Sequence, residues 1–227
     1  MREETLIDLD VAGKTALVIG GNPEAESKAR KLVDSGAKVT VVAASFTPGL
    51  RRMGRSGRIR AIQSDPGVPA VWKAVEELRP RAVFVSTGDG RLDEQAAEVA
   101  RGAGALVCVT DTPRLNDFNM PAIAKVGDIR VGISTGGRSP AMAGILRRRV
   151  EELIDREDVL QVKLQGELRQ ASKAHLRTPE SRKKFVYEVI NDKQVGLLLR
   201  RGEYERAKRL AEKLLIRAGK RDGKGKG

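Results

Sequence analysis

The sequence predicts an α/β protein whose first half is built on a parallel sheet, and two observations lead to this prediction. Short runs rich in β-branched residues alternate with amphipathic stretches. Several runs are apolar at almost every position, which is typical of strands covered by helices on both faces. The expected strands are TALVI (15–19), VTVVA (39–43), RIRAI (58–62), AVFV (82–85) and ALVCV (105–109), and the expected helices cover about 23–35, 68–78 and 91–102. We therefore assign residues 1–111 to a Rossmann-like doubly wound domain.

The pattern changes after Asp111. In DIRVGIS (128–134) apolar residues alternate with others, as in a strand with one exposed face, and the apolar positions are Ile129, Val131 and Ile133. The turn TGGRSP follows, and Ser139 and Pro140 suit the N-cap and first position of a long helix. The apolar stripe of that helix is Met142, Ile145, Leu146, Val150, Leu153 and Ile154. We expect residues 112–150 to form a central α/β region.

The remainder of the chain predicts helices and a short tail. Thr178 and Pro179 suit the start of a helix after a polar joint near 172–178. The apolar stripe of a last helix is Tyr204, Ala207, Ala211, Leu214 and Leu215. We therefore expect a helical C-terminal region over 151–218, and disorder in 219–227 because that segment is rich in glycine and lysine.

Composition excludes several classes of protein. The apolar runs are far shorter than the roughly 20 residues that span a bilayer, and hydrophobic residues make up 40% of the chain beside 32% charged residues. The polar, acidic start MREETLIDLD predicts a protein that stays in the cytoplasm. The single cysteine, Cys108, excludes an internal disulfide and a cysteine-based metal site, and its apolar surroundings predict an inert buried thiol.

Charge and histidine content narrow the chemistry. The formal net charge is +13, and residues 146–227 hold 23 Lys and Arg against 13 Asp and Glu. Such a surplus suits nucleic acid, anionic lipid or a highly acidic small molecule, or merely keeps a protein soluble. The single histidine, His175, lies in a polar stretch where a solvated side chain is expected. Acid–base chemistry would therefore use carboxylates, lysine, tyrosine or substrate atoms, with the demanding step left to a cofactor.

The turn after the first expected strand resembles a dinucleotide-binding loop. In VIGGNPEAESKAR, the positions of the G-x-G-x-x-G/A pattern are held by Gly20, Gly21, Asn22 and Ala25. A strand precedes this turn and a helix follows it, so helix N–H groups would face a phosphate. Asn22 replaces the second required glycine, and we expect its side chain to crowd the pyrophosphate, so that Asn22→Gly should tighten dinucleotide binding. The pattern favours nucleotide binding over an ordinary tight turn.

The ends of three other expected strands carry candidate residues. The second strand ends in Ala43, Ala44 and Ser45 without the acidic residue that holds a ribose hydroxyl, so this pattern leaves NAD and NADP undecided. The fourth ends in Ser86, Thr87, Gly88 and Asp89, at the edge where ligands bind in open α/β sheets, although a plain polar turn is equally consistent. Asp111 follows the fifth strand and would lie beside a nicotinamide. Taken alone, an aspartate in such a loop is more often a turn or capping residue than a functional one.

The segment STGGRSP has the parts of an anion site. It combines flexible glycines, hydroxyl groups, Arg138 and a helix N-terminus. The helix then carries Arg147, Arg148 and Arg149, which most simply form a solvated face.

Three segments stand out when they are taken together. They are LDVAGKTALVIGGNPEAESKARKLVDSGAKVTVVA, VTDTPRLNDFNMPAI and VGISTGGRSPAMAGILRRRVEELI. They resemble the precorrin-2 dehydrogenase and sirohydrochlorin ferrochelatase family, which forms the first module of siroheme synthases. SRKKFVYEVINDKQVGLLLRRGEYERAKRLAEKLL is similar to that family's helical C-terminal part, so the resemblance covers about residues 6–215. It implies an NAD-binding Rossmann domain, a central dimerisation region that helps to form the site, and a helical C-terminal region.

The resemblance also implies an activity and residues for it. Family members oxidise precorrin-2 to sirohydrochlorin with NAD⁺, and some insert Fe²⁺ to give siroheme, so it implies NAD as cofactor, precorrin-2 as substrate and a homodimer, with no resident metal. Asp111 matches the family's catalytic aspartate. The implied cofactor residues are Gly20, Gly21, Asn22, Pro23, Glu24, Ala44, Ser45, Thr87, Gly88 and Asp89, and the implied substrate residues are Ser134, Thr135, Gly136, Gly137 and Arg138.

The chain departs from the family pattern at two places near the cofactor. Asn22 stands where members have the third glycine of a GGG run, and Thr87–Gly88–Asp89 replaces a more acidic turn. Thr135 falls on a serine of the usual SSGG. The sequence shows no methyltransferase module of the kind found in multifunctional siroheme synthases, so we expect no synthesis of precorrin-2 itself.

Two other classes of function stay open. A non-catalytic Rossmann regulator that binds NAD would share the first half but would need neither Asp111 nor STGGRSP. A nucleic-acid binder would use the basic C-terminal region, yet aromatic residues are only 3% of the chain and no recognition motif occurs. The basic surplus also suits precorrin-2, which carries many carboxylates. Oxidation of precorrin-2 by NAD⁺ would separate the enzyme from both alternatives.

Overall fold

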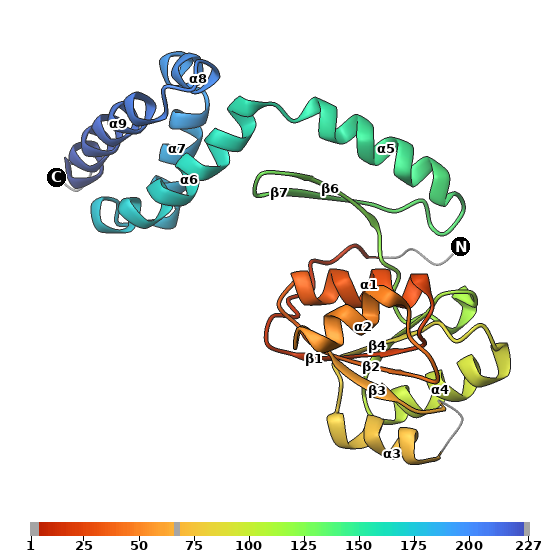
Figure 1. The fold of residues 1–227 in the computed structure, drawn as a ribbon. Coiled ribbons are helices and arrows are strands. Elements are labelled where there is room, and N and C mark those ends of the chain that lie inside the picture. Colours follow the sequence, from red (N-terminus) through yellow and green to blue (C-terminus); the bar gives the residue numbers. More distant parts are fainter. Residues whose placement is uncertain (1–4, 66–68, 225–227) are drawn as a thin grey trace. The chain divides into compact units, whose positions relative to one another are not determined.

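A computed structural model describes residues 5–65 and 69–224 of the chain. The chain divides into two compact units, Met1–Met120 and Pro121–Gly227 (Figure 1). The finer division expected from the sequence, with boundaries after residues 111, 150 and 218, stays a prediction.

The first unit contains a five-stranded parallel sheet in the order β3-β2-β1-β4-β5. Its strands are β1 (Thr15–Ile19), β2 (Lys38–Ala43), β3 (Arg60–Gln63), β4 (Ala82–Val85) and β5 (Leu106–Val109). The strand order reverses direction at β1, as in doubly wound folds that bind ligands at this switch point. The predicted Rossmann-like α/β fold is confirmed.

Helices cover both faces of the sheet (Figure 1). They are α1 (Pro23–Asp34) and α2 (Pro48–Arg55) on one face, and α3 (Pro69–Leu78) and α4 (Gly90–Gly102) on the other. Along β1, Ala16 and Val18 join the core with α1 and α2, whereas Leu17 and Ile19 join the core with α3 and α4. Burial on both faces explains the nearly continuous apolar runs.

Helix α2 was not predicted. The Thr47 hydroxyl caps it by accepting a hydrogen bond from the Leu50 N–H at 3.1 Å, and Pro48 occupies its first position. The helix has eight residues and buries only Gly49, Leu50 and Met53, so its apolar stripe is too short to recognise in the sequence. The predicted strands are otherwise displaced by no more than two residues from the observed ones.

The second unit begins with a two-stranded antiparallel sheet of β6 (Ala122–Val126) and β7 (Ile129–Ile133). The alternating burial of β7 confirms the predicted strand with one more exposed face, whereas β6 was not predicted. Helix α5 (Pro140–Leu153) packs against this sheet. Ser139 caps α5 by accepting a hydrogen bond from the Met142 N–H at 3.2 Å, as the sequence predicted.

Four helices make up the rest of the second unit as far as Lys224, the last described residue. They are α6 (Arg156–His175), α7 (Pro179–Ile190), α8 (Lys193–Arg200) and α9 (Tyr204–Lys224). Their apolar faces enclose one core, and Thr178 caps α7 as predicted, with its hydroxyl accepting from the Ser181 N–H at 3.1 Å. The polar joint near 172–178 is shorter than expected because α6 continues to His175. Within residues 5–65 and 69–224, no helix is long and apolar enough to cross a membrane.

The predicted disorder of 219–227 is wrong for residues 219–224. Helix α9 continues through Lys224. The Asp222 carboxylate accepts hydrogen bonds from the Ser181 hydroxyl at 2.5 Å and from the Arg177 N–H at 2.8 Å, and these bonds lower its pKa below the usual range. This contact holds the end of α9 against the start of α7, which glycine and lysine content could not reveal. Residues 225–227 lie outside the described residues.

Candidate active site

The turn after β1 fits closely between the ends of its neighbouring strands. A Cβ on Gly20 would lie 2.7 Å from the carbonyl carbon of Ser86, which follows β4. A Cβ on Gly21 would lie 2.9 Å from the Cβ of Ala43, and closer still to the carbonyl oxygen of Ser45. Gly20 also has a φ of +127°, a conformation that favours glycine. The close approach of the protein's own backbone therefore requires both predicted glycines.

Asn22 has a structural role that differs from the one expected, although an asparagine followed by a proline is a common start of a helix. It is the N-cap of α1, and its side-chain oxygen accepts a hydrogen bond from the Ala25 N–H at 2.9 Å. Its side-chain nitrogen donates to the carbonyl oxygen and the hydroxyl of Ser86 at 3.0 and 3.1 Å. These bonds hold the side chain against the helix and the end of β4. The side chain therefore supports the turn, and its expected crowding of the pyrophosphate stays a prediction.

Asn22→Gly should accordingly weaken dinucleotide binding, in contrast to the expectation from sequence. We also expect the free energy of unfolding to fall by about 1–2 kcal/mol, because the variant loses the cap and two hydrogen bonds to Ser86. Urea unfolding and titration with NAD⁺ measure the two effects. Tighter NAD⁺ binding at unchanged stability would contradict this role of Asn22.

The end of β2 presents Ala44 and Ser45 at the surface, and their contact with a cofactor stays a prediction. The Ala44 carbonyl accepts a hydrogen bond from the Gln63 side chain at 3.1 Å. Glu26, on α1, accepts a hydrogen bond from the Thr47 hydroxyl at 2.6 Å. This bond and the nearby Arg30 hold the pKa of Glu26 below its usual range. The Glu26–Thr47 contact therefore ties α1 to the start of α2.

The residues that follow β4 form hydrogen bonds mainly with one another and with the start of α4. The Thr87 hydroxyl donates to Asp93 at 2.6 Å, and Asp93 is only 2% exposed. The Asp89 side chain caps α4 by accepting from two backbone N–H groups of its first turn, at 2.9 and 3.2 Å. The side chains of Thr87 and Asp89 are thus occupied within the turn. At Gly88, with a φ of +82°, the backbone is open to a ligand.

The first turn of α1 has a donor that fits a phosphate. The third and fourth helical N–H groups are taken by the side chain and carbonyl oxygen of Asn22, at 2.9 and 3.0 Å, and Pro23 has no N–H. Among the described residues, nothing accepts a hydrogen bond from the Glu24 N–H. Lys28 lies 3.0 Å from the Glu24 carboxylate and offsets its charge. This turn therefore fits the phosphate of a dinucleotide.

Asp111 lies two residues beyond β5, at the same edge of the sheet. Its side chain is exposed, and in the part of the chain that the structure describes it makes no hydrogen bond or ion pair. The 3₁₀ helix η1 (Pro113–Leu115) follows, and the side chain of its N-cap, Thr112, makes no capping bond either. The described contacts therefore give Asp111 no capping task, and its carboxylate is open to a ligand.

In the second unit, Ser134–Arg138 forms the turn between β7 and α5. Gly136 and Gly137, with φ of +60° and +73°, shape the turn. The Thr135 hydroxyl donates to the Ser139 carbonyl and accepts from the Ser139 N–H, both at 3.2 Å. The five predicted residues thus lie together at the N-terminus of α5, where oxyanions are favoured.

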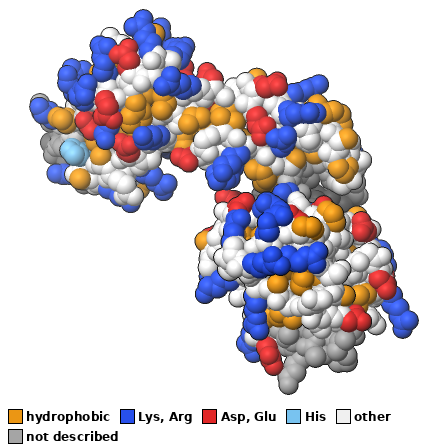
Figure 2. All heavy atoms as spheres, viewed as in Figure 1, with side chains coloured by type: hydrophobic (Ala, Val, Ile, Leu, Met, Phe, Trp, Pro, Cys, Tyr) orange, Lys and Arg blue, Asp and Glu red, His pale blue; other side chains and the backbone are white. Residues whose placement is uncertain are grey.

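Basic residues of the second unit are partly paired with carboxylates. Figure 2 shows Lys and Arg side chains gathered over its helices, with acidic side chains between them. On α5, Arg147 pairs with Glu151 at 2.6 Å, so it belongs to the helix surface as its position suggested. Farther along, hydrogen bonds from Lys208 and Tyr204 hold the pKa of Glu167 below its usual range.

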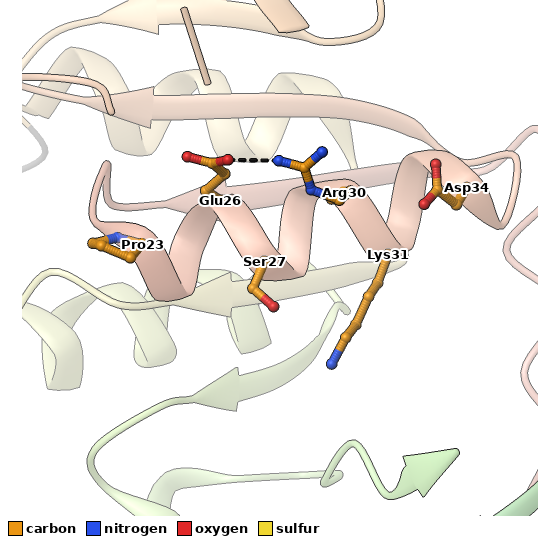
Figure 3. A pocket seen from close by; sticks show the side chains of 6 residues that line it. All are labelled: Pro23, Glu26, Ser27, Arg30, Lys31 and Asp34. Carbon is orange, nitrogen blue, oxygen red and sulfur yellow. Dashed lines mark hydrogen bonds and ion pairs between the residues drawn. The ribbon is translucent and has the colours of Figure 1, made fainter. Parts of the chain in front are cut away.

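A groove of about 310 Å³ runs along the outer surface of α1 (Figure 3). Its lining residues are Pro23, Glu26, Ser27, Arg30, Lys31 and Asp34. An ion pair of 2.6 Å between Glu26 and Arg30 lies along it. Only Pro23 among these belongs to the predicted cofactor residues, so the groove shares a single residue with the predicted cofactor site.

Cys108 and His175 have the environments predicted for them. Cys108 is buried, and burial raises the pKa of its thiol. His175 is exposed, with its Nδ1 3.0 Å from the Ala171 carbonyl oxygen. Across residues 5–65 and 69–224, no group of three or more His, Cys, Asp and Glu side chains is arranged to hold a metal ion.

Comparisons with known proteins bear on this arrangement. Residues 7–122 match the family model described as "Putative NAD(P)-binding". A precorrin-2 dehydrogenase of Methanosarcina barkeri is 31% identical over 192 residues, which cover 82% of this chain and 83% of that protein. The chain belongs to the precorrin-2 dehydrogenase family. In this family member, the NAD(P)-binding match covers the whole sheet edge from Gly20 to Asp111.

Part of a longer protein also matches this chain. Siroheme synthase 3 of Aeromonas hydrophila is 30% identical over 202 residues, which cover 88% of this chain. The chain spans only 42% of the length of that protein. A solved structure titled "SirC, precorrin-2 dehydrogenase" has a TM-score of 0.69 at 21% identity and covers 92% of this chain and 100% of that one. This likeness shows that the two chains have the same overall fold.

Proposed function

We propose that this protein catalyses the NAD-dependent dehydrogenation of precorrin-2 to sirohydrochlorin. The observation that carries the proposal is that one sheet edge of the first unit presents both a phosphate-compatible glycine turn and Asp111, whose carboxylate has no hydrogen-bond or ion-pair partner among the described residues. Membership of the precorrin-2 dehydrogenase family supports the same activity. The overall change converts precorrin-2 and NAD⁺ into sirohydrochlorin, NADH and a proton.

Bound NAD⁺ supplies the acceptor for the hydride, and the chain supplies its binding surface. Gly20, Gly21 and the Glu24 N–H would hold the pyrophosphate of the cofactor. Ala44 and Ser45 lie where the adenosine ribose is held in doubly wound folds. The open backbone at Gly88 completes the cofactor surface on the side of β4.

Asp111 accepts the proton that leaves precorrin-2. It stands at the carboxyl end of β5, where a nicotinamide lies in this type of fold. The single histidine belongs to α6 in the other unit, and a carboxylate is a competent general base. The exposed position leaves Asp111 able to meet a substrate.

Ser134–Arg138 holds carboxylates of the substrate. Oxyanions are favoured by three kinds of donor in this turn: the N-terminus of α5, the backbone of Gly136 and Gly137, and the Arg138 side chain. A basic chain with a net charge of +13 also attracts such a polyanion over a distance. Insertion of Fe²⁺, which the resemblance implies for some members, is not part of this proposal.

The cofactor should be NAD⁺ in preference to NADP⁺, by at least about tenfold in kcat/KM, equivalent to about 1.4 kcal/mol. No arginine directly follows β2 to receive a 2′-phosphate, and the nearest, Arg51 and Arg52, come only at the fourth and fifth positions of α2. Steady-state kinetics with both cofactors measure the preference. The double variant Arg51→Gln/Arg52→Gln should keep its NAD⁺ kinetics, and comparable kcat/KM values for the two cofactors would refute the preference.

We also propose a homodimer built around residues 112–150. The face of β7 with Ile129, Val131 and Ile133 suggested the dimer interface, but it is half-buried and β7 packs against α5. Other apolar side chains of this region must therefore contribute to the interface. Ile123 is 44% and Met142 42% exposed. A two-stranded sheet gains stability from further packing, and two-fold pairs are the commonest assembly.

Light scattering at micromolar concentration should therefore give about twice the chain mass of 24.7 kDa. Ile123→Asp should shift the protein toward the monomer while its circular dichroism stays unchanged. Lys125→Asp, on the same exposed sheet face, is the charge control. A wild-type monomer with full activity would exclude the dimer.

Anaerobic incubation with precorrin-2 and NAD⁺ tests the proposed function. We expect absorbance of NADH and of sirohydrochlorin to rise together. Binding of NAD⁺ without oxidation would favour a regulatory Rossmann protein.

A further inference from the structure

The segment after Asp111 closes the open edge of the sheet. Strand β5 is the outermost strand, so the N–H groups of Val107 and Val109 that point away from β4 have no strand to pair with. The Asn116 side-chain oxygen accepts from the Val109 N–H at 2.6 Å, and the Asp117 carboxylate accepts from the Val107 N–H at 2.9 Å. The Asp117 N–H in turn donates to the Val107 carbonyl at 2.9 Å. Two side chains thus replace a sixth strand.

Ionic and apolar contacts reinforce this closure. Arg101 of α4 lies 3.0 Å from the Asp117 carboxylate and also donates to the Leu115 carbonyl. Leu115 packs into the core shared with α3 and α4, whereas Phe118 packs into the core on the opposite face of the sheet. The Phe118 ring meets Phe84 edge to face, with centroids 5.3 Å apart. The segment therefore wraps around the sheet edge and is anchored on both faces.

These contacts fix the chain on both sides of Asp111. Before it, the Thr110 N–H donates to the Val85 carbonyl at 2.9 Å, and after it the chain is fixed again at Asn116. We propose that Asn116 and Asp117 are positioning residues that set the location of Asp111 for proton transfer. This inference rests on the proposed function. None of the anchoring contacts uses the Asp111 side chain, so they fix its backbone and leave its carboxylate free.

The kinetic consequence follows from the geometry of proton transfer. A misplacement of about 1 Å can lower the rate of a catalysed step about 10²-fold. Asn116→Ala removes the acceptor of the Val109 N–H and releases the chain closest to Asp111. We expect kcat for dehydrogenation to fall by about tenfold or more, while the Kd for NAD⁺ changes less than about twofold, since the glycine turn lies two strands away.

A double-mutant cycle in the full-length protein separates positioning from a general structural role. If Asn116 acts through Asp111, Asn116→Ala should have little further effect on the residual rate of Asp111→Ala. Asn191→Ala is the matched control, since it removes an exposed side-chain hydrogen bond to the Tyr187 carbonyl in the other unit, and it should keep wild-type kcat. Equal fold-losses from Asn116→Ala in both backgrounds, or a wild-type kcat, would overturn the positioning role.

Hydrogen exchange provides the check on folding. In Asn116→Ala the Val109 amide should exchange faster, whereas the amide of Val18 in the central strand β1 should keep its protection. Loss of protection at both amides together with loss of activity would overturn positioning in favour of unfolding. A wild-type protein that does not oxidise precorrin-2 would refute the proposed function itself. An active wild-type protein with a multiplicative cycle would refute the positioning role alone.

Discussion

Asp111→Ala should lower the rate of precorrin-2 dehydrogenation by about 10²–10⁴-fold, the loss typical of removing a positioned general base. The melting temperature and the Kd for NAD⁺ should stay close to wild type, because among the described residues the Asp111 side chain makes no contact that supports the fold. Single-turnover rates with saturating precorrin-2 and NAD⁺ measure the chemical step directly.

Asp117→Ala is an informative companion, because Asp117 belongs to the same segment but bonds to Arg101 and Val107. It should lower both the rate and the melting temperature, in contrast to Asp111→Ala. A folded Asp111→Ala protein with near wild-type turnover would remove Asp111 from the mechanism and leave water or the substrate's own carboxylates as the base.

Gly21→Ala is the second change expected to have a large effect. Its new Cβ would lie 2.9 Å from the Cβ of Ala43 and closer still to the Ser45 carbonyl oxygen, both at the rigid end of β2. The turn must move away from β2, and we expect the free energy of unfolding to fall by about 3 kcal/mol. Since the same turn lies beneath the pyrophosphate, NAD⁺ affinity should fall by at least about tenfold.

Gly102→Ala is the matched control for this prediction. Gly102 ends α4, and a Cβ there would have no neighbour within 4 Å. The substitution should be neutral or should stabilise the protein by up to about 1 kcal/mol. Denaturant unfolding and NAD⁺ titration of both variants make the comparison. Wild-type affinity in Gly21→Ala would show that the turn does not hold the cofactor.

The parts of the fold with strong local signals were predictable from the sequence. Four strands of the parallel sheet, β1, β2, β4 and β5, are buried and nearly continuously apolar, so their positions were found within two residues. The more exposed β3 was also found within two residues. The caps at Ser139 and Thr178 were found because each hydroxyl residue precedes a proline that opens a helix. The placement of Asp111 at the carboxyl edge followed directly from the position of β5.

Some of the features that were missed depend on contacts between distant residues. The bonds between Asn22 and Ser86 join residues 64 positions apart, so the sequence alone did not reveal them. The anchoring of Asn116 and Asp117 requires knowing that β5 is an edge strand, which only the strand order reveals. Helix α2 is too short for a recognisable period. The bonds to Ser86 and the anchoring of Asn116 and Asp117 depend on tertiary packing. Asn22–Pro23 and Thr47–Pro48, in contrast, carry the same cap-and-proline signal as Ser139–Pro140, and that signal was overlooked.

The proposed dehydrogenase activity is tested most directly by measuring NADH and sirohydrochlorin together during anaerobic turnover of precorrin-2 with NAD⁺. We expect catalytic formation of both products in equal amounts, over many turnovers, and loss of both in Asp111→Ala. Tight NAD⁺ binding without formation of either product, under conditions where a known precorrin-2 dehydrogenase is active, would contradict the proposed activity.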